Sequence, residues 1–351
     1  MNKGQTPLNG SDAQRYLILA EEFSQDPHYG KTLRGVLRYR RESVVAILDT
    51  THAGETMDGV PIVASIDEAL PLRPDTALVG VVTQGGRFPA DWRALLRSCV
   101  ERGLDLENGL HVRLTDDPEL VALAQAHGVE LRDLREPPSD LSTATGANLD
   151  VDATIVLTVG SDCAIGKMTA TCELDLEARR RGLRSVFVPT GQTGIAIAGW
   201  GISVDAVVSD FLAGAAERLV VEAGSRGDLL WVEGQGAILH PIYSGVTVGL
   251  IHGSAPHLYV LCHEAGRTEV EGDPTHSPIP SLPELVDLHE RMSLKLRPAK
   301  VVCIALNTSF LGEEDARAAV AAAEAETGLP ADDPVRFGAG KLLEAVLNHR
   351  P

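Results

Sequence analysis

The segment 156–182 constrains the fold more than any other part of this chain. An apolar run ending at Val159 leads into a glycine-containing loop, then into Gly166-Lys167, and then into a helical pattern that stops at Gly182. A strand that turns into a helix in this way presents successive backbone N–H groups and the positive end of the helix to an anion, and a lysine adds a point charge. The pattern therefore predicts a phosphate site. Its residues are Gly160, Ser161, Asp162, Cys163, Ala164, Ile165, Gly166, Lys167, Met168 and Thr169.

This loop departs from the usual phosphate loop, G-x-x-x-x-G-K-[ST], in two respects. Five residues separate Gly160 from Gly166, a spacing that resembles the dethiobiotin synthetase branch of P-loop proteins. Met168 stands where a hydroxyl normally binds Mg²⁺, and Thr169 lies about 100° further round the helix. ATP or GTP chemistry generally needs a metal that bridges phosphates, whereas a ligand whose phosphates are only held, such as coenzyme A, does not. We therefore assign the loop to cofactor binding and assign no metal ligands.

Apolar runs alternate with amphipathic stretches on both sides of this loop. Strands that alternate with helices pair in parallel and form doubly wound sheets. The predicted fold class is α/β, with an N-terminal Rossmann-like parallel-sheet domain and a C-terminal P-loop NTPase-like α/β domain. In the first part the expected strands are 15–20, 43–49 and 76–82, and the expected helices are 31–41 and 90–102. In the second part the expected strands lie near 153–159, 184–188, 228–233, 257–262 and 299–305, with helices between them and an Ala/Glu-rich helix near 313–327.

A stretch rich in Pro, Ser and Thr at 136–146 marks the expected domain boundary. The predicted organisation is a Rossmann-like domain at 1–138, a linker at 139–152 and a P-loop domain at 153–351. Asp49 ends the second expected strand, where Rossmann-like folds often place a ribose-binding carboxylate. The turn after the first strand carries no Gly-x-Gly-x-x-Gly, however, so dinucleotide binding there has weak support.

Composition and charge exclude several classes of protein. The chain has 31 basic and 49 acidic residues and a net charge of −18, which repels a nucleic-acid backbone, so we expect no nucleic-acid partner. No run approaches the roughly 18 apolar residues of a membrane span, and no export signal is evident, so we expect no membrane partner. The five cysteines are scattered, which argues against a disulfide framework and a structural zinc site and favours the cytoplasm. Homo-oligomerisation is expected only on general grounds.

Polar residues follow three of the expected strands at their carboxyl ends, the usual ligand crevice of an open sheet. Gln192 and Thr193 follow the strand near 184–188 and are predicted to bind substrate. Glu233 ends the strand near 228–233, where P-loop relatives of the dethiobiotin synthetase type keep an acidic metal ligand; a loop cap is the alternative. Arg267 could pair with a substrate carboxylate through two hydrogen bonds. A solvated loop arginine is the alternative.

The catalytic base is predicted to be His240 or Glu233, and the sequence leaves this choice open. Neutral imidazole operates near pH 7, and His240 lies seven residues after Glu233. The following histidines, His252, His257 and His263, match no helical metal-binding pair. Backbone N–H groups in the glycine-rich turns near 191–194 or 234–236 are expected to stabilise an oxyanion. Cys163 is interpreted as a small packing residue of the loop, with a stabilised thiolate as the alternative.

Several motifs together resemble a P-loop family long known only as a domain of unknown function. They are Gly-Ser-Asp-Cys-Ala-Ile-Gly-Lys-Met-Thr at 160–169, Thr-Gly-Gln-Thr-Gly at 190–194, Val-Glu-Gly-Gln-Gly at 232–236 and His-Gly-Ser-Ala-Pro at 252–256. Gly-Lys-Thr-Leu-Arg-Gly-Val-Leu-Arg-Tyr at 30–39 and Asn-Gly-Leu-His at 108–111 resemble its companion Rossmann-like domain. One group of this family, the D-glutamate N-acetyltransferases, is associated with moving an acetyl group from acetyl-CoA to D-glutamate.

The resemblance implies an N-acetyltransferase that uses acetyl-CoA as cosubstrate and an acidic D-amino acid as acceptor. It also implies a pathway partner, a racemase of the enolase superfamily that acts on the N-acetylated product. Two other functions stay open at this point. One is an ATP- and Mg²⁺-dependent ligase or kinase of the dethiobiotin synthetase type, and the other is a non-catalytic module that senses a nucleotide or coenzyme A.

Overall fold

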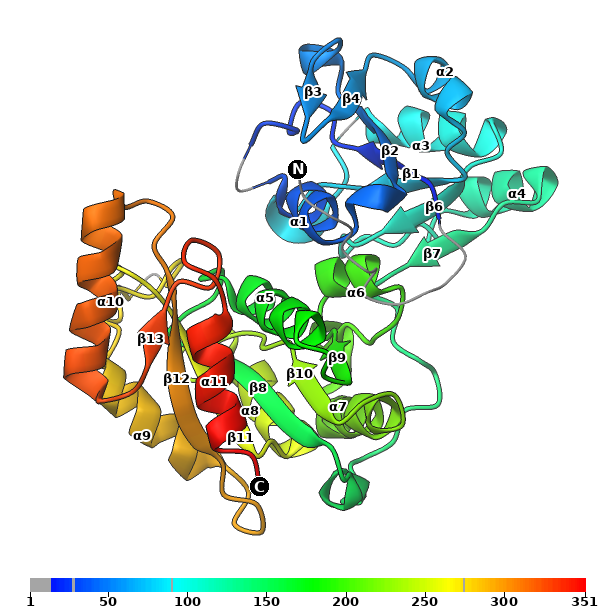
Figure 1. Cartoon of the computed structure of the whole chain (residues 1–351). Coiled ribbons are helices and arrows are strands. Elements are labelled where there is room, and N and C mark those ends of the chain that lie inside the picture. The colour runs from blue at the N-terminus through cyan, green and yellow to red at the C-terminus, as the bar shows by residue number, and fades with distance from the viewer. Residues whose placement is uncertain (1–13, 27–28, 90, 274) are drawn as a thin grey trace. The chain divides into compact units, whose positions relative to one another are not determined.

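The computed structural model describes residues 14–26, 29–89, 91–273 and 275–351, and it divides into two compact units (Figure 1). Unit 1 comprises the chain up to Glu136 together with Gln192–Trp200, and unit 2 comprises Pro137–Gly191 and Gly201–Pro351. Residues 192–200 therefore group with unit 1, although the sequence interpretation placed them in the second domain with the rest of 153–351.

Unit 1 is built on a seven-stranded sheet in the order β3-β4-β2-β1-β5-β6-β7. The chain moves outward from β1 to β2 and β4 and then returns to β5 on the other side of β1, which is the Rossmann order, with the antiparallel β3 added at one edge. This confirms the expected Rossmann-like class. The strands are β1 (Tyr16–Leu19), β2 (Val44–Leu48), β3 (Thr56–Met57), β4 (Val60–Val63), β5 (Thr76–Val79), β6 (Asp105–Asn108) and β7 (Leu131–Asp133).

The helices of unit 1 follow from local sequence signals. In α4 the Asp117 carboxylate accepts hydrogen bonds from the first-turn N–H groups, Pro118 occupies the first helical position, and Gly128 ends the helix with a φ of 68°. Helix α6 is unusual because residues 194–198 are all buried. The helices are α1 (Lys31–Tyr39), α2 (Ile66–Ala69), α3 (Trp92–Glu101), α4 (Pro118–His127) and α6 (Gln192–Ala198).

Asp49 has a structural role in unit 1. It is fully buried, and its carboxylate accepts hydrogen bonds from the backbone N–H groups of Ser24 and Thr51. Burial opposes the charged form, but these hydrogen bonds outweigh it and lower the pKa of Asp49. The carboxylate thus joins the ends of β1 and β2, which accounts for an acidic residue at this position without a ribose.

Unit 2 contains a six-stranded, wholly parallel sheet in the order β13-β12-β11-β8-β10-β9. Strand β8, which leads into the predicted phosphate loop, is central and lies between β11 and β10. The strand order reverses at β8, and ligands of open α/β sheets bind at the carboxyl edge where this happens. The strands are β8 (Thr154–Gly160), β9 (Ser185–Val188), β10 (Leu229–Val232), β11 (Leu258–Glu264), β12 (Lys300–Asn307) and β13 (Ala331–Asp332).

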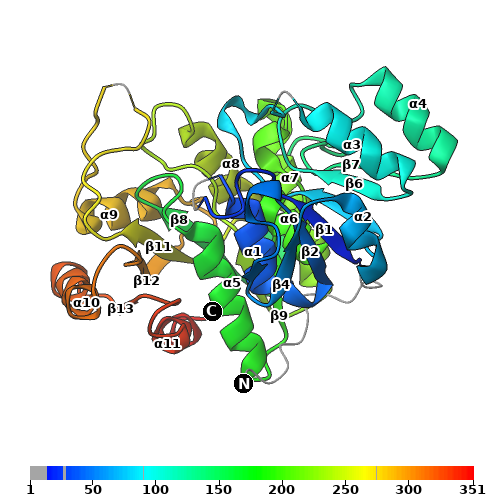
Figure 2. The ribbon, with the colours of Figure 1, turned by 90° about the horizontal axis from the view of Figure 1, so that it is seen from above.

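Helices cover both faces of this sheet. Helices α7 and α8 pack closely because Gly249 and Gly253 leave room: a Cβ at Gly249 would lie 2.1 Å from Leu212, and one at Gly253 would lie 2.2 Å from the Ala213 carbonyl oxygen. Helices α10 and α11 lie on either side of β13 (Figures 1 and 2). The helices are α5 (Lys167–Arg180), α7 (Ser209–Gly224), α8 (Ser244–Ser254), α9 (Leu282–Met292), α10 (Glu313–Thr327) and α11 (Gly340–Asn348).

The segment interpreted as a linker is anchored to α7. The buried Glu217 carboxylate accepts hydrogen bonds from the N–H and hydroxyl groups of Thr145 and from the N–H of Gly146, at 2.7–2.8 Å. A Cβ at Gly214 would lie 1.9 Å from the Ser142 carbonyl oxygen, so the segment runs directly over the helix. Burial disfavours the carboxylate, yet the hydrogen bonds from Thr145 and Gly146 prevail and lower the pKa of Glu217.

Replacing Glu217 by Ala is expected to lower the free energy of unfolding by about 1–3 kcal/mol, because three donors lose their acceptor. Since folding lowers the pKa of Glu217, this contribution is present near neutral pH and is lost as the pH falls through the acidic range where the carboxylate protonates. Urea unfolding at neutral and acidic pH measures both effects. Glu222→Ala, on the exposed face of the same helix, is the control and should change stability little. Equal effects of the two variants at neutral pH would contradict this interpretation.

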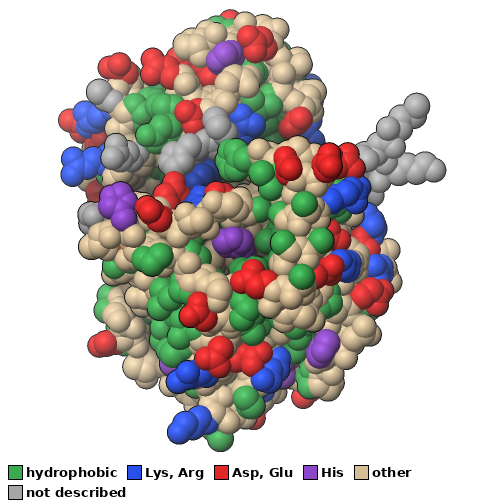
Figure 3. Space-filling model, turned by 90° about the vertical axis from the view of Figure 1, so that its left-hand side faces the viewer, with side chains coloured by type: hydrophobic (Ala, Val, Ile, Leu, Met, Phe, Trp, Pro, Cys, Tyr) green, Lys and Arg blue, Asp and Glu red, His purple; other side chains and the backbone are tan. Residues whose placement is uncertain are grey.

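Two surface observations complete the fold. None of the helices in the described part of the chain combines the length and apolar character that a membrane span needs. On the face drawn in Figure 3, Lys and Arg side chains lie among Asp and Glu side chains, and the described residues form no continuous basic stripe there.

Candidate functional site

The phosphate loop occupies the turn between β8 and α5, as predicted. Strand β8 ends at Gly160 and α5 begins at Lys167. Gly166 has a φ of 102°, a conformation that L side chains rarely adopt, and a Cβ at Gly160 would lie 2.7 Å from Cδ1 of Ile165. Gly166 is therefore needed for the path of the backbone, and Gly160 leaves room for the Ile165 side chain. Ala164 also has a positive φ, of 55°, so the loop is held in an unusual conformation between them.

The loop carries a set of backbone N–H groups that donate to no described residue. Among the described residues, no oxygen accepts a hydrogen bond from the backbone N–H groups of 164–168. These groups include the first residues of α5, where the helix dipole is positive. Unpaired donors at a helix N-terminus form an anion site, which supports the predicted phosphate binding.

Lys167 is buried beneath this loop. Its side chain passes between two glycines, since Cβ atoms at Gly160 and Gly234 would lie 3.2 and 3.1 Å from its Cδ. The Nζ group donates a 2.6 Å hydrogen bond to the Asp162 carbonyl oxygen. Burial lowers the pKa of Lys167, and an arriving phosphate would favour its charged form by supplying the opposite charge.

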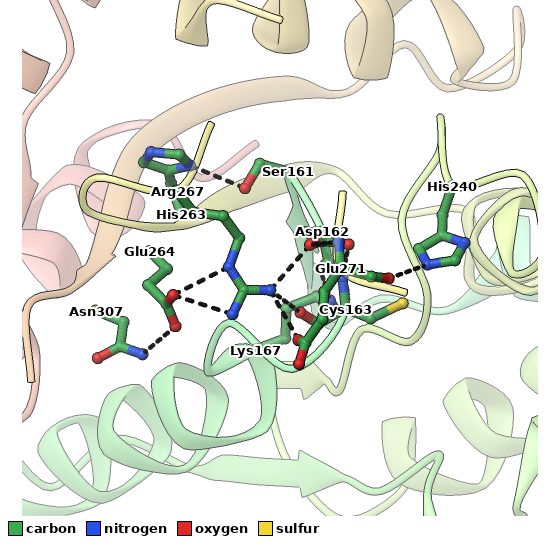
Figure 4. Close-up of polar contacts among 10 residues, drawn as sticks. All are labelled: Ser161, Asp162, Cys163, Lys167, His240, His263, Glu264, Arg267, Glu271 and Asn307. Atoms are coloured by element: carbon green, nitrogen blue, oxygen red, sulfur yellow. Dashed lines mark hydrogen bonds and ion pairs between the residues drawn. The ribbon is translucent and has the colours of Figure 1, made fainter. Parts of the chain in front are cut away.

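Arg267 is engaged by carboxylates of the protein. Its guanidinium lies 2.9 Å from Oδ2 of the fully buried Asp162 and about 3.0 Å from oxygens of Glu264 and Glu271 (Figure 4). It also donates to the Cys163 carbonyl oxygen. Burial disfavours the guanidinium charge, but the hydrogen bonds that Arg267 donates to Asp162 and Glu264 outweigh it and raise the pKa of Arg267. In this arrangement Arg267 holds the phosphate loop, and its contact with a substrate carboxylate stays a prediction.

Replacing Arg267 by Ala is expected to lower the free energy of unfolding by about 3–5 kcal/mol, the range for removing one partner of a buried ion pair. Urea unfolding followed by circular dichroism measures this loss. Arg291→Ala is the control, because Arg291 forms an exposed ion pair with Asp287 on α9. Adding Asp162→Asn to the Arg267 variant should recover part of the stability. A loss no larger than that of the control would show that Arg267 does not hold the loop.

Glu233 lies directly after β10, the neighbour of β8. Its side chain is 3 % exposed, and Oε2 accepts hydrogen bonds from the N–H groups of Thr190 (2.9 Å) and Gly191 (3.1 Å). Burial raises the pKa of Glu233 to about 7, although these hydrogen bonds oppose the shift. A carboxylate accepts about four hydrogen bonds, so these two leave Glu233 able to accept a further one. Because its pKa is about 7, Glu233 can also gain or lose a proton near neutral pH.

The hydrogen bonds of His240 fix its tautomer. The Ile242 N–H donates to Nδ1 at 3.2 Å, so Nδ1 is unprotonated, and Nε2 carries the hydrogen that it donates to the Glu271 carbonyl oxygen at 3.2 Å. Both ring nitrogens of this buried histidine are thus engaged. To accept a proton, Nδ1 would have to release the Ile242 N–H. This arrangement favours Glu233 over His240 as the base.

Asp162, Cys163 and His240 each place one potential metal-ligand atom within 4.8 Å of the other two. Figure 4 shows Nε2 of His240 turned toward Glu271 and the Cys163 sulfur. Because Nε2 carries a proton, it cannot bind an ion in this state. Arg267 already neutralises the Asp162 carboxylate. Burial raises the pKa of the Cys163 thiol, which favours its neutral form. These contacts do not suit a cation.

Gln192 and Thr193 form the start of α6 and belong to unit 1, not to the unit that holds the phosphate loop. The Thr193 hydroxyl lies 2.9 Å from that of Thr32 on α1, and the Gln192 side chain packs under Gly109. The N–H groups of Gly191 and Gly234 are also engaged, by Glu233 and by the Thr158 hydroxyl. Neither is free for the oxyanion that we expected at these turns.

Several residues at the carboxyl edge were given no functional role from the sequence. The Glu271 side chain accepts a hydrogen bond from Arg267, and its backbone N–H donates one to the Asp162 carboxylate. Its carbonyl oxygen accepts a hydrogen bond from His240. His263 lies 2.9 Å from the Ser161 hydroxyl, and Asn307 donates to Glu264. The sequence signal that could have indicated these contacts is the pair of acidic residues near Arg267, Glu264 three positions before it and Glu271 four positions after it.

Comparisons with known proteins agree with this geometry. Residues 142–343 match the P-loop domain of a family described as a domain of unknown function, DUF1611, and residues 49–137 match its Rossmann-like N-terminal domain. The crystal structure of a DUF1611 family protein from Anabaena variabilis is 43% identical in sequence, has a TM-score of 0.89, and aligns over 95% of this chain and 99% of that chain.

Two curated proteins are also similar over most of their length. A protein from Tritonibacter scottomollicae named D-glutamate N-acetyltransferase is 41% identical over 90% of this chain and 93% of its own length. A protein of the same name from a Pseudoalteromonas species is 35% identical over 80% of this chain and 83% of its own. The fold and the loop define a P-loop protein with a Rossmann-like companion domain. This chain belongs to the DUF1611 family.

Proposed function

We propose that this protein transfers the acetyl group of acetyl-CoA to the amino group of D-glutamate. The observation that carries the proposal is the 41% identity, over 90% of the chain, to a protein named D-glutamate N-acetyltransferase. The free N–H groups at 164–168 and the buried Lys167 support a ligand that carries phosphates. Met168, in place of the usual hydroxyl, suits phosphates that are held rather than cleaved.

The residues of the site suit acetyl-CoA as cosubstrate. Acetyl-CoA supplies the acetyl group, and the N–H groups of 164–168 with Lys167 would hold a phosphate of its nucleotide part. The acceptor enters as an ammonium ion and must lose a proton before its nitrogen can attack a thioester. We assign the removal of that proton to Glu233, because its pKa of about 7 leaves a substantial ionised fraction at neutral pH.

Thiol release from acetyl-CoA tests the proposal directly. D-Glutamate, L-glutamate and D-aspartate are offered in turn, each with and without EDTA. We expect release with D-glutamate, much less with the other two, and no loss in EDTA. Absence of thiol release with every acceptor would overturn the proposal.

Three further properties belong to the same proposal. We expect a cytoplasmic protein, consistent with five cysteines that are all free thiols. We also expect a homo-oligomer and a pathway in which an enolase-superfamily racemase converts the N-acetylated product. Light scattering of the purified protein measures the oligomeric state. Turnover of the N-acetylated product in a mixture with such a racemase tests the pathway.

A further inference from the structure

We propose that Gln235 and Glu233 together bind the ammonium group of the acceptor, and that Gln235 holds the Glu233 carboxylate toward it. This rests on the proposed function, in which Glu233 takes a proton from the acceptor amine. It adds the place where that amine docks, and every residue involved belongs to unit 2.

Gln235 lies in the turn after β10, two residues after Glu233. Its Nε2 donates a 3.2 Å hydrogen bond to the Thr190 hydroxyl, which in turn donates to the Glu233 carbonyl oxygen at 2.6 Å. The backbone carbonyl oxygen of Gln235 accepts a 2.8 Å hydrogen bond from the Thr247 hydroxyl on α8. Both the side chain and the backbone of Gln235 are thus fixed, and the amide is tied to the same turn that donates to the Glu233 carboxylate.

One oxygen of each side chain remains available in this arrangement. The N–H groups of Thr190 and Gly191 both donate to Oε2 of Glu233, which leaves Oε1. Among the described residues, no donor contacts Oε1 of Gln235, whose side chain is partly exposed. A Cβ at Gly191 would lie 2.6 Å from Nε2 of Gln235 and 3.4 Å from Oε1 of Glu233. The amide and the carboxylate therefore border the same place, beside a residue that has no side chain.

An ammonium ion matches these two oxygens, because it carries three N–H donors and a positive charge. The charged groups that face Glu233 are Asp205, whose negative charge raises the pKa of Glu233, and Lys167, whose stem passes the turn after β10. An arriving ammonium ion supplies the opposite charge to Glu233 and Asp205 and so favours the ionised form of Glu233. Binding of the acceptor thus prepares the carboxylate to take a proton.

The pair also accounts for the two protons that the acceptor nitrogen loses. Glu233 takes the first from the ammonium ion, which leaves a neutral amine held by Gln235. The amine nitrogen attacks the acetyl carbon, the C–N bond forms, and the C–S bond breaks with its electron pair remaining on sulfur. The sulfur takes the second proton from nitrogen and leaves as the thiol, and Glu233 returns its proton to water.

Two variants of Gln235 test the proposal. Gln235→Met keeps the length of the side chain and removes both polar atoms, whereas Gln235→Glu keeps an oxygen for the ammonium ion but loses the amide donor. Gln125→Met, a change of an exposed glutamine on α4, is the control. Calorimetry measures the affinity for D-glutamate, for coenzyme A, and for glutarate, which has the two carboxylates of D-glutamate and no ammonium group.

We expect Gln235→Met to weaken D-glutamate binding about 10–100-fold, the size of a lost hydrogen bond to a charged group. Affinity for glutarate and coenzyme A should stay within about twofold. Gln235→Glu should retain D-glutamate affinity within about threefold. Both variants should raise the pKa of Glu233, because the hydrogen bond from the Gln235 amide lowers it. Carboxyl ¹³C NMR measures this pKa, with the Glu233 signal identified by its absence in Glu233→Gln. The control should change none of these values.

An equal loss of D-glutamate and glutarate affinity in Gln235→Met, or an unchanged D-glutamate affinity, would overturn the proposal. If the wild-type protein binds no D-glutamate and releases no thiol, the proposed function fails. Methylammonium then tests the ammonium site by itself: it should lower the pKa of Glu233 in the wild-type protein and not in Gln235→Met. A wild-type pKa that methylammonium leaves unchanged would overturn the ammonium site as well.

Discussion

Replacing Glu233 by Gln is expected to reduce kcat about 10²–10⁴-fold, the usual contribution of a positioned general base. The amide oxygen of Gln can still accept the Thr190 and Gly191 N–H groups, so the 190–191 turn should keep its position. The amide cannot take a proton from the acceptor amine. Steady-state thiol release measures the loss, and calorimetry should show coenzyme A binding unchanged.

The pH dependence separates a base from a structural residue. Because burial raises the pKa of Glu233 to about 7, the wild-type kcat should fall as the pH drops below about 7 and Glu233 becomes protonated. The residual activity of the Gln variant should lack this limb. Glu222→Gln, a change of an exposed glutamate on α7, is the control and should keep both rate and profile. A Gln variant with wild-type kcat would remove Glu233 from the mechanism.

Replacing Lys167 by Ala is expected to weaken coenzyme A binding by about 1.5–3 kcal/mol, the contribution of a hydrogen bond to a charged group, which is roughly 12–160-fold in Kd. Affinity for D-glutamate should change little, because the phosphate loop is not assigned to the acceptor. Calorimetric titration with each ligand measures both values.

Lys341→Ala is the matched control for Lys167, since its Nζ pairs with Glu324 near the surface of unit 2. It should leave the affinity for coenzyme A unchanged. An equal loss of affinity for coenzyme A and D-glutamate in the Lys167 variant would indicate a general disturbance of the site and contradict the assignment of the loop.

The fold was largely predictable from the sequence because its core strands are short apolar runs followed by strong turn and helix signals. The expected strand at 153–159 corresponds to β8 and the expected helix at 313–327 to α10. The edge strands β3 and β13 contain two residues each, too few to produce a periodic pattern. No sequence signal indicates that α6 groups with unit 1, because its apolar run at 195–198 is short and fits the core of either unit.

The conformation of the loop between β8 and α5 was predictable from single residues. Gly166 and Lys167 define the loop through backbone conformation and charge, and both signals are local. Arg267 shows the limit, because its role depends on Asp162, which is about a hundred residues away in sequence and only 2.9 Å away in space. The choice between His240 and Glu233 likewise depended on burial and on hydrogen-bond polarity, which sequence spacing does not reveal.

The most direct test of the central claim uses acetyl-CoA labelled with ¹³C in the acetyl group. The wild-type protein is incubated with D-glutamate in EDTA, and the products are separated by chiral chromatography with mass detection. The account predicts one labelled N-acetyl-D-glutamate for each thiol released. Label found only in free acetate, or no labelled product while Mg²⁺ and ATP yield ADP, would contradict it.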